Sequence, residues 1–192
     1  MSKEIITRFD SLAKRIEGLS ELARLAVAVA VTQHLMDEYL LQPEDRRSSF
    51  VVPWAETTPL LWTALTHPSA ELKRTLETKL KEFVEEYFDQ EPTEYGQPRY
   101  AADAAYACMA AIEAYCGNNK AAAGPVSDLL ADAQRRAQAI STEMGEDLMS
   151  ASANARVLRL QHLELDHVEN AVSLLEREGF SVGVLPQLRL LF

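Results

Sequence analysis

One stretch near the carboxyl end, residues 157–179, constrains the fold of this 192-residue chain more than any other. At about 100° per residue its apolar side chains gather on one side, which predicts a long amphipathic helix packed on a core. Glu164 falls within that apolar stripe, and Gln161 and His167 flank it. A carboxylate in such a place must find partners or become neutral, so we expect a buried polar cluster of Gln161, Glu164 and His167. The stripe itself comprises Val157, Leu160, Leu165, Val168, Ala171, Leu174 and Leu175.

Helical periodicity recurs along the rest of the chain and predicts a single all-α domain over residues 1–192, a bundle of about seven helices. The run from Leu25 to Val31 is apolar all round, so its helix should be central, together with the helices over 99–116 and 152–179. Thr58 followed by Pro59 predicts the start of a short helix. The expected helices cover residues 5–16, 20–41, 58–65, 72–87, 99–116, 124–144 and 152–179.

The last thirteen residues, 180–192, have a different pattern. Alternating apolar residues interrupted by Pro186 predict an extended C-terminal tail rather than a helix. The tail is too apolar for a free terminus, so we expect it to dock on the bundle or on a second copy of the chain. The residues that make this contact are Leu188, Leu190, Leu191 and Phe192.

Charge and cysteine content exclude several classes of function. The formal net charge of −10 disfavours nucleic acid and anionic membrane surfaces, which both require clustered Lys and Arg. No apolar run is long enough to span a bilayer, and the amino-terminal residues do not resemble a signal peptide. Cys108 and Cys116 are too far apart on a helix to form a disulfide, which favours reduced thiols and a cytoplasmic location.

The common catalytic and nucleotide-binding motifs are missing from the sequence. It has no phosphate-binding glycine loop, dinucleotide fingerprint, zinc-protease His-Glu-x-x-His, nucleophile elbow or Cys-x-x-Cys. Catalytic residues scattered over the fold would leave no such motif, so an enzyme is not excluded. We expect a protein without a cofactor, and a non-enzyme is the favoured interpretation.

The sharpest chemical candidate is Glu164-Leu-Asp-His167, because Glu-x-x-His on a helix is the unit of di-iron carboxylate bundles. Those sites need a second such unit, and no other histidine here has an acid three residues before it. The alternative is that Glu164 bonds a tyrosine, an arginine or a buried amide and holds no metal, which is the expectation we favour. A mononuclear metal site would instead need ligands from other helices, with candidates Glu113, Asp103 and Asp37.

Two further polar groups bear on this candidate. Gln33, His34, Asp37 and Glu38 would form a polar cluster near Glu164 if the two helices are neighbours, or would simply mark a helix end emerging into water. A second face of the long helix also has metal-like spacing, but it points away from the apolar stripe, so a solvated face is the better interpretation. That face carries His162, Asp166 and Glu169.

Aromatic residues gather around residues 50–62. Trp54 and Trp62 flank the Thr57-Thr58-Pro59 turn, with Phe50 nearby. They could floor a pocket, although such residues more often anchor a loop.

The order of segments resembles that of a known bacterial family. The motifs are Leu-Ala-Arg-Leu-Ala-Val-Ala-Val-Ala-Val at 22–31, Ala-Cys-Met-Ala-Ala-Ile at 107–112, and Leu-Leu-Glu-Arg-Glu-Gly at 174–179 followed by Val-Gly-Val at 182–184. Over most of the chain they resemble the domain-of-unknown-function family 416, whose members often carry an acid near the position of Tyr106. The resemblance implies a cytosolic, all-helical bacterial protein and brings no catalytic residues.

Three functions follow as hypotheses. The favoured one is a non-catalytic protein-binding or regulatory module. The alternative is a metal-binding or enzymatic bundle centred on Glu164 and His167. The third is an immunity-type inhibitor that would neutralise a basic toxin with acidic residues, namely Glu82, Glu85, Glu86, Asp89, Glu91 and Glu94.

Overall fold

The computed structural model describes residues 1–41, 52–89 and 100–192 of the chain, and every regular element within them is a helix. The predicted all-α class is therefore confirmed. The helices are α1 (Lys3–Gly18), α2 (Glu21–Leu40), α3 (Val52–Thr66), α4 (Ala70–Asp89), α5 (Tyr100–Cys116), α6 (Gly124–Glu143), α7 (Ala151–Glu178) and α8 (Leu185–Arg189), with short 3₁₀ turns η3 (Asn119–Ala123) and η4 (Val182–Val184).

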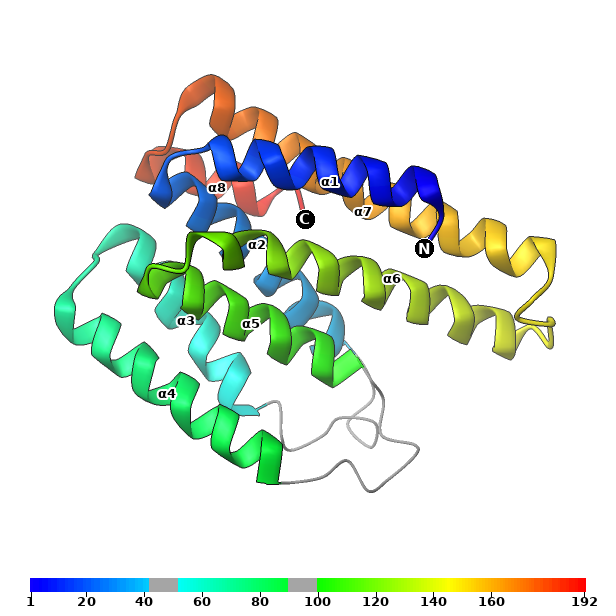
Figure 1. Ribbon diagram of the computed structural model, residues 1–192, viewed down its shortest axis with the longest axis horizontal. Helices are drawn as coiled ribbons and strands as arrows, with labels where there is room; N and C mark the ends of the chain where they lie inside the picture. The colour runs from blue at the N-terminus through cyan, green and yellow to red at the C-terminus, as the bar shows by residue number, and fades with distance from the viewer. Residues whose placement is uncertain (42–51, 90–99) are drawn as a thin grey trace.

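The middle of the bundle consists of α2, α5 and α6, which pack against one another (Figure 1). The apolar run of α2 is buried on all sides, as its sequence predicted. Small residues bring the helices close together: a Cβ added to Gly124, at the start of α6, would lie 2.9 Å from the Cβ of Ala110 on α5. The hydroxyl of Thr32 on α2 reaches across to the carbonyl of Ala107 on α5 at 3.1 Å. The sequence had placed α7 rather than α6 in this middle position.

The long helix α7 lies along one side of the molecule, between α6 and α1 (Figure 1). Its 28 residues extend for about 42 Å. The side chain of Ser150 caps its amino end, and Gly179 ends it with φ of +70°, a conformation that favours glycine. α6 and α7 form an antiparallel hairpin, whereas α1 runs parallel to α7. α7 therefore has one face toward α2 and α6 and another toward α1.

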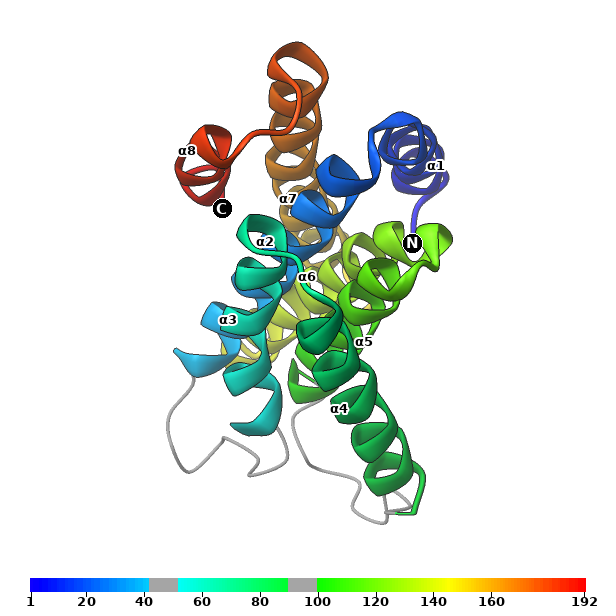
Figure 2. The same ribbon diagram turned by 90° about the vertical axis from the view of Figure 1, so that its left-hand side faces the viewer.

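The carboxyl-terminal segment is helical, so the predicted extended tail is wrong. Residues 182–189 form η4 and α8, and α8 lies beside α2 on the side opposite α1 (Figure 2). The physical reason is Pro186: it occupies the first turn of α8, where the fixed φ of proline starts a helix instead of interrupting a strand. The expected docking on the bundle does occur, since Leu188 is fully buried and Leu191 and Phe192 pack partly buried against the core. Leu190 is 86% exposed.

The helix predicted over 58–65 is longer than expected. α3 begins at Val52, and Pro59 lies inside it rather than at its first position. Thr58 does not cap the helix: it is buried, and its hydroxyl donates to the carbonyl of Trp54 one turn earlier. Burial of Trp54 and Leu61 outweighs the local start signal at Thr58-Pro59. Phe50 lies outside the described residues.

Candidate functional site

Glu164 is the centre of a buried polar cluster formed by three helices. Its side chain, 2% exposed, points from α7 toward α2 and α6. One oxygen, Oε1, accepts a hydrogen bond from the guanidinium of Arg136 on α6. The other, Oε2, lies 3.3 Å from Nε2 of His34 on α2 and 3.4 Å from Nδ1 of His167 on α7. All three atoms are buried.

Arg136 joins this carboxylate to two others. Its Nε lies 2.7 Å from Oδ2 of Asp132, one turn earlier on α6, and its Nη1 lies 3.6 Å from Oε2 of Glu38 on α2. Three carboxylates thus surround one guanidinium, whose single positive charge can balance only one negative charge.

The partners of each acid set its protonation. Burial raises the pKa of Glu164, but the neighbouring His34 and the Arg136 guanidinium outweigh it and hold the pKa at about 2. Burial raises the pKa of Asp132 to about 6, against the opposing effect of Arg136. Both carboxylates are therefore ionised in most molecules at neutral pH.

Gln161 lies one turn before Glu164 and is also buried. Its Nε2 donates to the carbonyl of Leu130 on α6 at 3.2 Å. It therefore joins α7 to α6 as a neighbour of the Glu164 cluster, while His167 is a direct neighbour of the Glu164 carboxylate.

The third member of the cluster is His34 of α2. The sequence predicted a polar cluster of α2 residues near Glu164 only if the two helices are neighbours, and His34 does lie beside Glu164. The acids named as possible recruits have other partners: Asp103 pairs with Arg135, Glu113 accepts from Asn118, and Asp37 accepts from Gln33. Arg136 and Asp132 were not predicted as members of the cluster. Their i, i+4 spacing on one helix was a readable signal for an ion pair, but it did not show that the pair faces Glu164.

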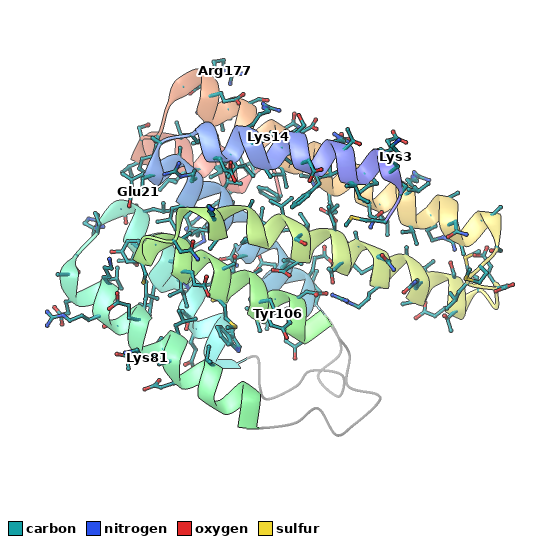
Figure 3. The ribbon with its side chains drawn as sticks, in the orientation of Figure 1. Lys3, Lys14, Glu21, Lys81, Tyr106 and Arg177 are labelled. Atoms are coloured by element: carbon teal, nitrogen blue, oxygen red, sulfur yellow. The ribbon has the colours of Figure 1, made fainter. Side chains whose placement is uncertain are left out.

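The opposite face of α7 is covered by α1, so its interpretation as a solvated face is wrong in part. Arg8 of α1 makes a bidentate ion pair with Glu169, with N–O distances of 2.8 and 2.9 Å, and also donates a hydrogen bond to Asp166. Its Nη1 lies 3.1 Å from Nδ1 of His162. Seven residues further along both helices, Arg15 pairs with Glu176 in the same way, which keeps the parallel helices in register. Figure 3 shows the outer side of this pair, with Lys3, Lys14 and Arg177 exposed.

A pocket of about 820 Å³ adjoins the cluster between α2, α3 and α8. His34 belongs to both, because its ring lines the pocket while its Nε2 faces Glu164. Phe192 also lines the pocket, and its ring centroid lies 5.7 Å from that of His34 and 6.2 Å from that of His167. On the other wall, the guanidinium of Arg189 stacks 4.1 Å from the centre of the Trp62 ring.

No family model, no curated protein and no solved structure matches this chain. The resemblance to family 416 stays a prediction. In the described ranges, no helix combines the length and apolar character needed to cross a membrane.

Acidic residues of the inhibitor hypothesis lie on α4 and beyond it. Glu82 is exposed on α4, while Glu91 and Glu94 lie outside the described residues.

Proposed function

We propose that this protein is a non-catalytic, cytoplasmic protein-binding module and that the pocket between α2, α3 and α8 is its binding site. The observation that carries the proposal is the lining of the pocket. Trp62, Arg189 and Phe192 form its walls, and such residues dominate the energetics of protein interfaces. The resemblance to family 416 supports a bacterial origin and nothing about the partner.

The pocket also favours one chemistry of partner. Asp37, exposed at the edge of the pocket, adds negative charge to a chain whose net charge is already −10, and Leu41, 77% exposed, adds an apolar rim. A protein segment that combines apolar and basic side chains complements both features. Assembly of two copies through the C-terminal residues is a weaker proposal, because Leu188 is buried within the chain and Leu190 alone among them is largely exposed.

A model peptide tests this proposal directly. An amphipathic peptide of about 18 residues made of Leu and Lys should bind the full chain, and one made of Leu and Glu should not. Trp62→Ala and Asp37→Asn should each weaken binding at least fivefold by calorimetry, which is the scale of an interface residue worth about 1 kcal/mol. Glu71→Gln, an exposed acid on α4, is the matched control and should leave the affinity unchanged. Equal losses in Asp37→Asn and Glu71→Gln would show that the peptide follows net charge alone and would contradict the proposal.

A further inference from the structure

Three potential metal-ligand atoms converge in the interior beside the pocket. They are Nε2 of His34, Oε2 of Glu164 and Nδ1 of His167, all within 4.8 Å of one another. Each has almost no accessible surface. Buried polar atoms are costly unless they are satisfied, because they have lost their contacts with water. The carboxylate oxygen and the two imidazole nitrogens must therefore satisfy one another through a proton on each nitrogen, or share a cation placed between them.

The spacing of these atoms fits a metal ion better than it fits direct contact. A ring nitrogen that carries a proton donates to a carboxylate oxygen, whereas one that carries only a lone pair repels it unless a cation lies between the two. Zinc bonds to nitrogen and oxygen ligands are about 2.0–2.1 Å long, so two ligands at a tetrahedral angle lie about 3.3 Å apart. Glu164 Oε2 lies 3.3 Å from the His34 nitrogen and 3.4 Å from the His167 nitrogen.

The charge around the cluster points the same way. Glu38, Asp132 and Glu164 lie around Arg136, and one guanidinium leaves two of these negative charges uncompensated. Glu38 is partly exposed to water, whereas Asp132 and Glu164 are buried, and a divalent cation beside Glu164 would balance the buried negative charge.

We propose that His34, Glu164 and His167 bind one divalent first-row transition metal ion of the zinc class. Two imidazole nitrogens and one carboxylate oxygen suit zinc, iron(II), cobalt(II) and nickel(II), whereas calcium and magnesium prefer ligand sets made only of oxygen. This site lies beyond the proposed peptide-binding function, and neither depends on the other. The proposal also differs from our expectation from the sequence. There, the missing second Glu-x-x-His unit argued against a metal, whereas here His34 of α2 supplies the further ligand.

Two neighbouring side chains support the metal ligands. Arg136 engages Oε1 of Glu164, which fixes the carboxylate so that Oε2 faces the two imidazoles. The Phe192 ring packs against both imidazoles. Because the ligand atoms have almost no accessible surface, a side chain must move for an ion to enter, and Phe192 lines the pocket in contact with both rings.

The test is zinc binding by the full-length chain after removal of metal with a chelator. Calorimetry should give one zinc ion per chain, and cobalt(II) should give the visible absorption of a low-symmetry four- or five-coordinate site. His34→Gln and His167→Gln should each bind zinc at least about 100-fold more weakly, since loss of a ligand exceeds the roughly 10–100-fold cost of losing a supporting group. Zinc should also raise the melting temperature of the wild type and leave that of both variants unchanged.

The matched control is His162→Gln, on the opposite face of the same helix. His162 has acids four and seven residues later, but Arg8 occupies them, so this variant should bind zinc like the wild type. Circular dichroism confirms folding, and His167, 30% exposed, provides a variant that tolerates substitution if His34→Gln does not fold. The proposal is overturned if the wild type binds no zinc, if both glutamine variants bind it as tightly as the wild type, or if binding is lost in His162→Gln instead. Each of those results would leave the two imidazoles as structural neighbours of Glu164.

Discussion

The two faces of α7 carry similar residues, but those residues differ in their burial and in their partners. One face presents Glu164 and His167 toward α2 and α6, and the other presents His162, Asp166 and Glu169 toward α1. The outer acids are partly open to water and are paired with arginines of α1. On the inner face a single arginine serves three acids. Spacing along a helix therefore does not show which partners its acids meet; the neighbouring helices and the burial of each face decide that.

Burial makes this difference matter energetically. An ion pair in contact with water contributes little, because water and salt compete with the partner. In the interior no water competes, so each unsatisfied atom costs free energy and each satisfied one is strongly held. Substitutions on the two faces should therefore separate clearly.

The largest effect should come from Glu164→Ala, measured by urea unfolding of metal-free protein. Removing the carboxylate takes a buried partner from Arg136 and should cost roughly 1–3 kcal/mol of unfolding free energy. Glu164→Leu should cost less, because an apolar replacement of a buried ionic group is often close to neutral. If neither variant changes stability, the inner face is not buried as described, and the comparison between the faces fails.

A smaller loss, about 1 kcal/mol, should follow Gln161→Ala. This substitution removes the hydrogen bond that the buried Gln161 side chain donates to the Leu130 carbonyl, together with the packing of that side chain. Gln187→Ala, at an exposed position of α8, is the control and should leave the urea midpoint unchanged. Equal effects of the two substitutions would mean that the α6–α7 contact does not contribute to stability.

On the outer face, Glu169→Gln should cost less than about 1 kcal/mol at low salt, because the Arg8–Glu169 pair is partly open to water. The cost should shrink further at about 1 M salt, where the screening length is about 3 Å. The Glu164 variants should show no comparable dependence on salt. A salt-independent loss above 2 kcal/mol for Glu169→Gln, on the order of the values for buried pairs, would contradict the distinction between the partly exposed outer face and the buried inner face.

The smallest effect should be a pH dependence of the outer face. Arg8 lowers the pKa of Glu169 from its ordinary value of 4.5, and Arg15 does the same for Glu176. Because the pKa is lowered in the folded chain, the stabilisation is present above pH 4.5 and is lost as the pH falls through the folded-state pKa values. Comparing wild type with Glu169→Gln by thermal unfolding between pH 7 and about pH 3 isolates this contribution. The gap between the two should close as the pH falls, and a gap that widens would contradict the assignment.

Much of α7 could be predicted from the sequence because the residues that determine it lie within the helix itself. The 3.6-residue period gave the helix, its apolar stripe and the placement of Glu164 among apolar residues, and the structure shows Glu164 buried there. Gly179 and the serine-rich start marked its ends within a residue or two. The C-terminal residues show the limit of local patterns, since Pro186 fits both a broken strand and a helix start.

The partners of Glu164 could not be predicted with the same certainty. Which cation reaches Glu164 depends on how α6 and α7 slide past each other in their hairpin, and which histidine reaches it depends on where α2 crosses α7. Both are set by packing of many side chains across helices, such as the close approach at Gly124, and no single segment encodes them. For this reason the sequence placed His34 near Glu164 only on the condition that the two helices are neighbours, and it did not identify Arg136 as a partner of Glu164.

The most direct test of the difference between the two faces is an anomalous diffraction map, recorded at the zinc absorption edge from crystals grown with zinc. The account predicts one strong peak between Nε2 of His34, Oε2 of Glu164 and Nδ1 of His167, and no peak beside His162, Asp166 and Glu169. A peak on the outer face with none on the inner one, or no peak on either, would contradict it.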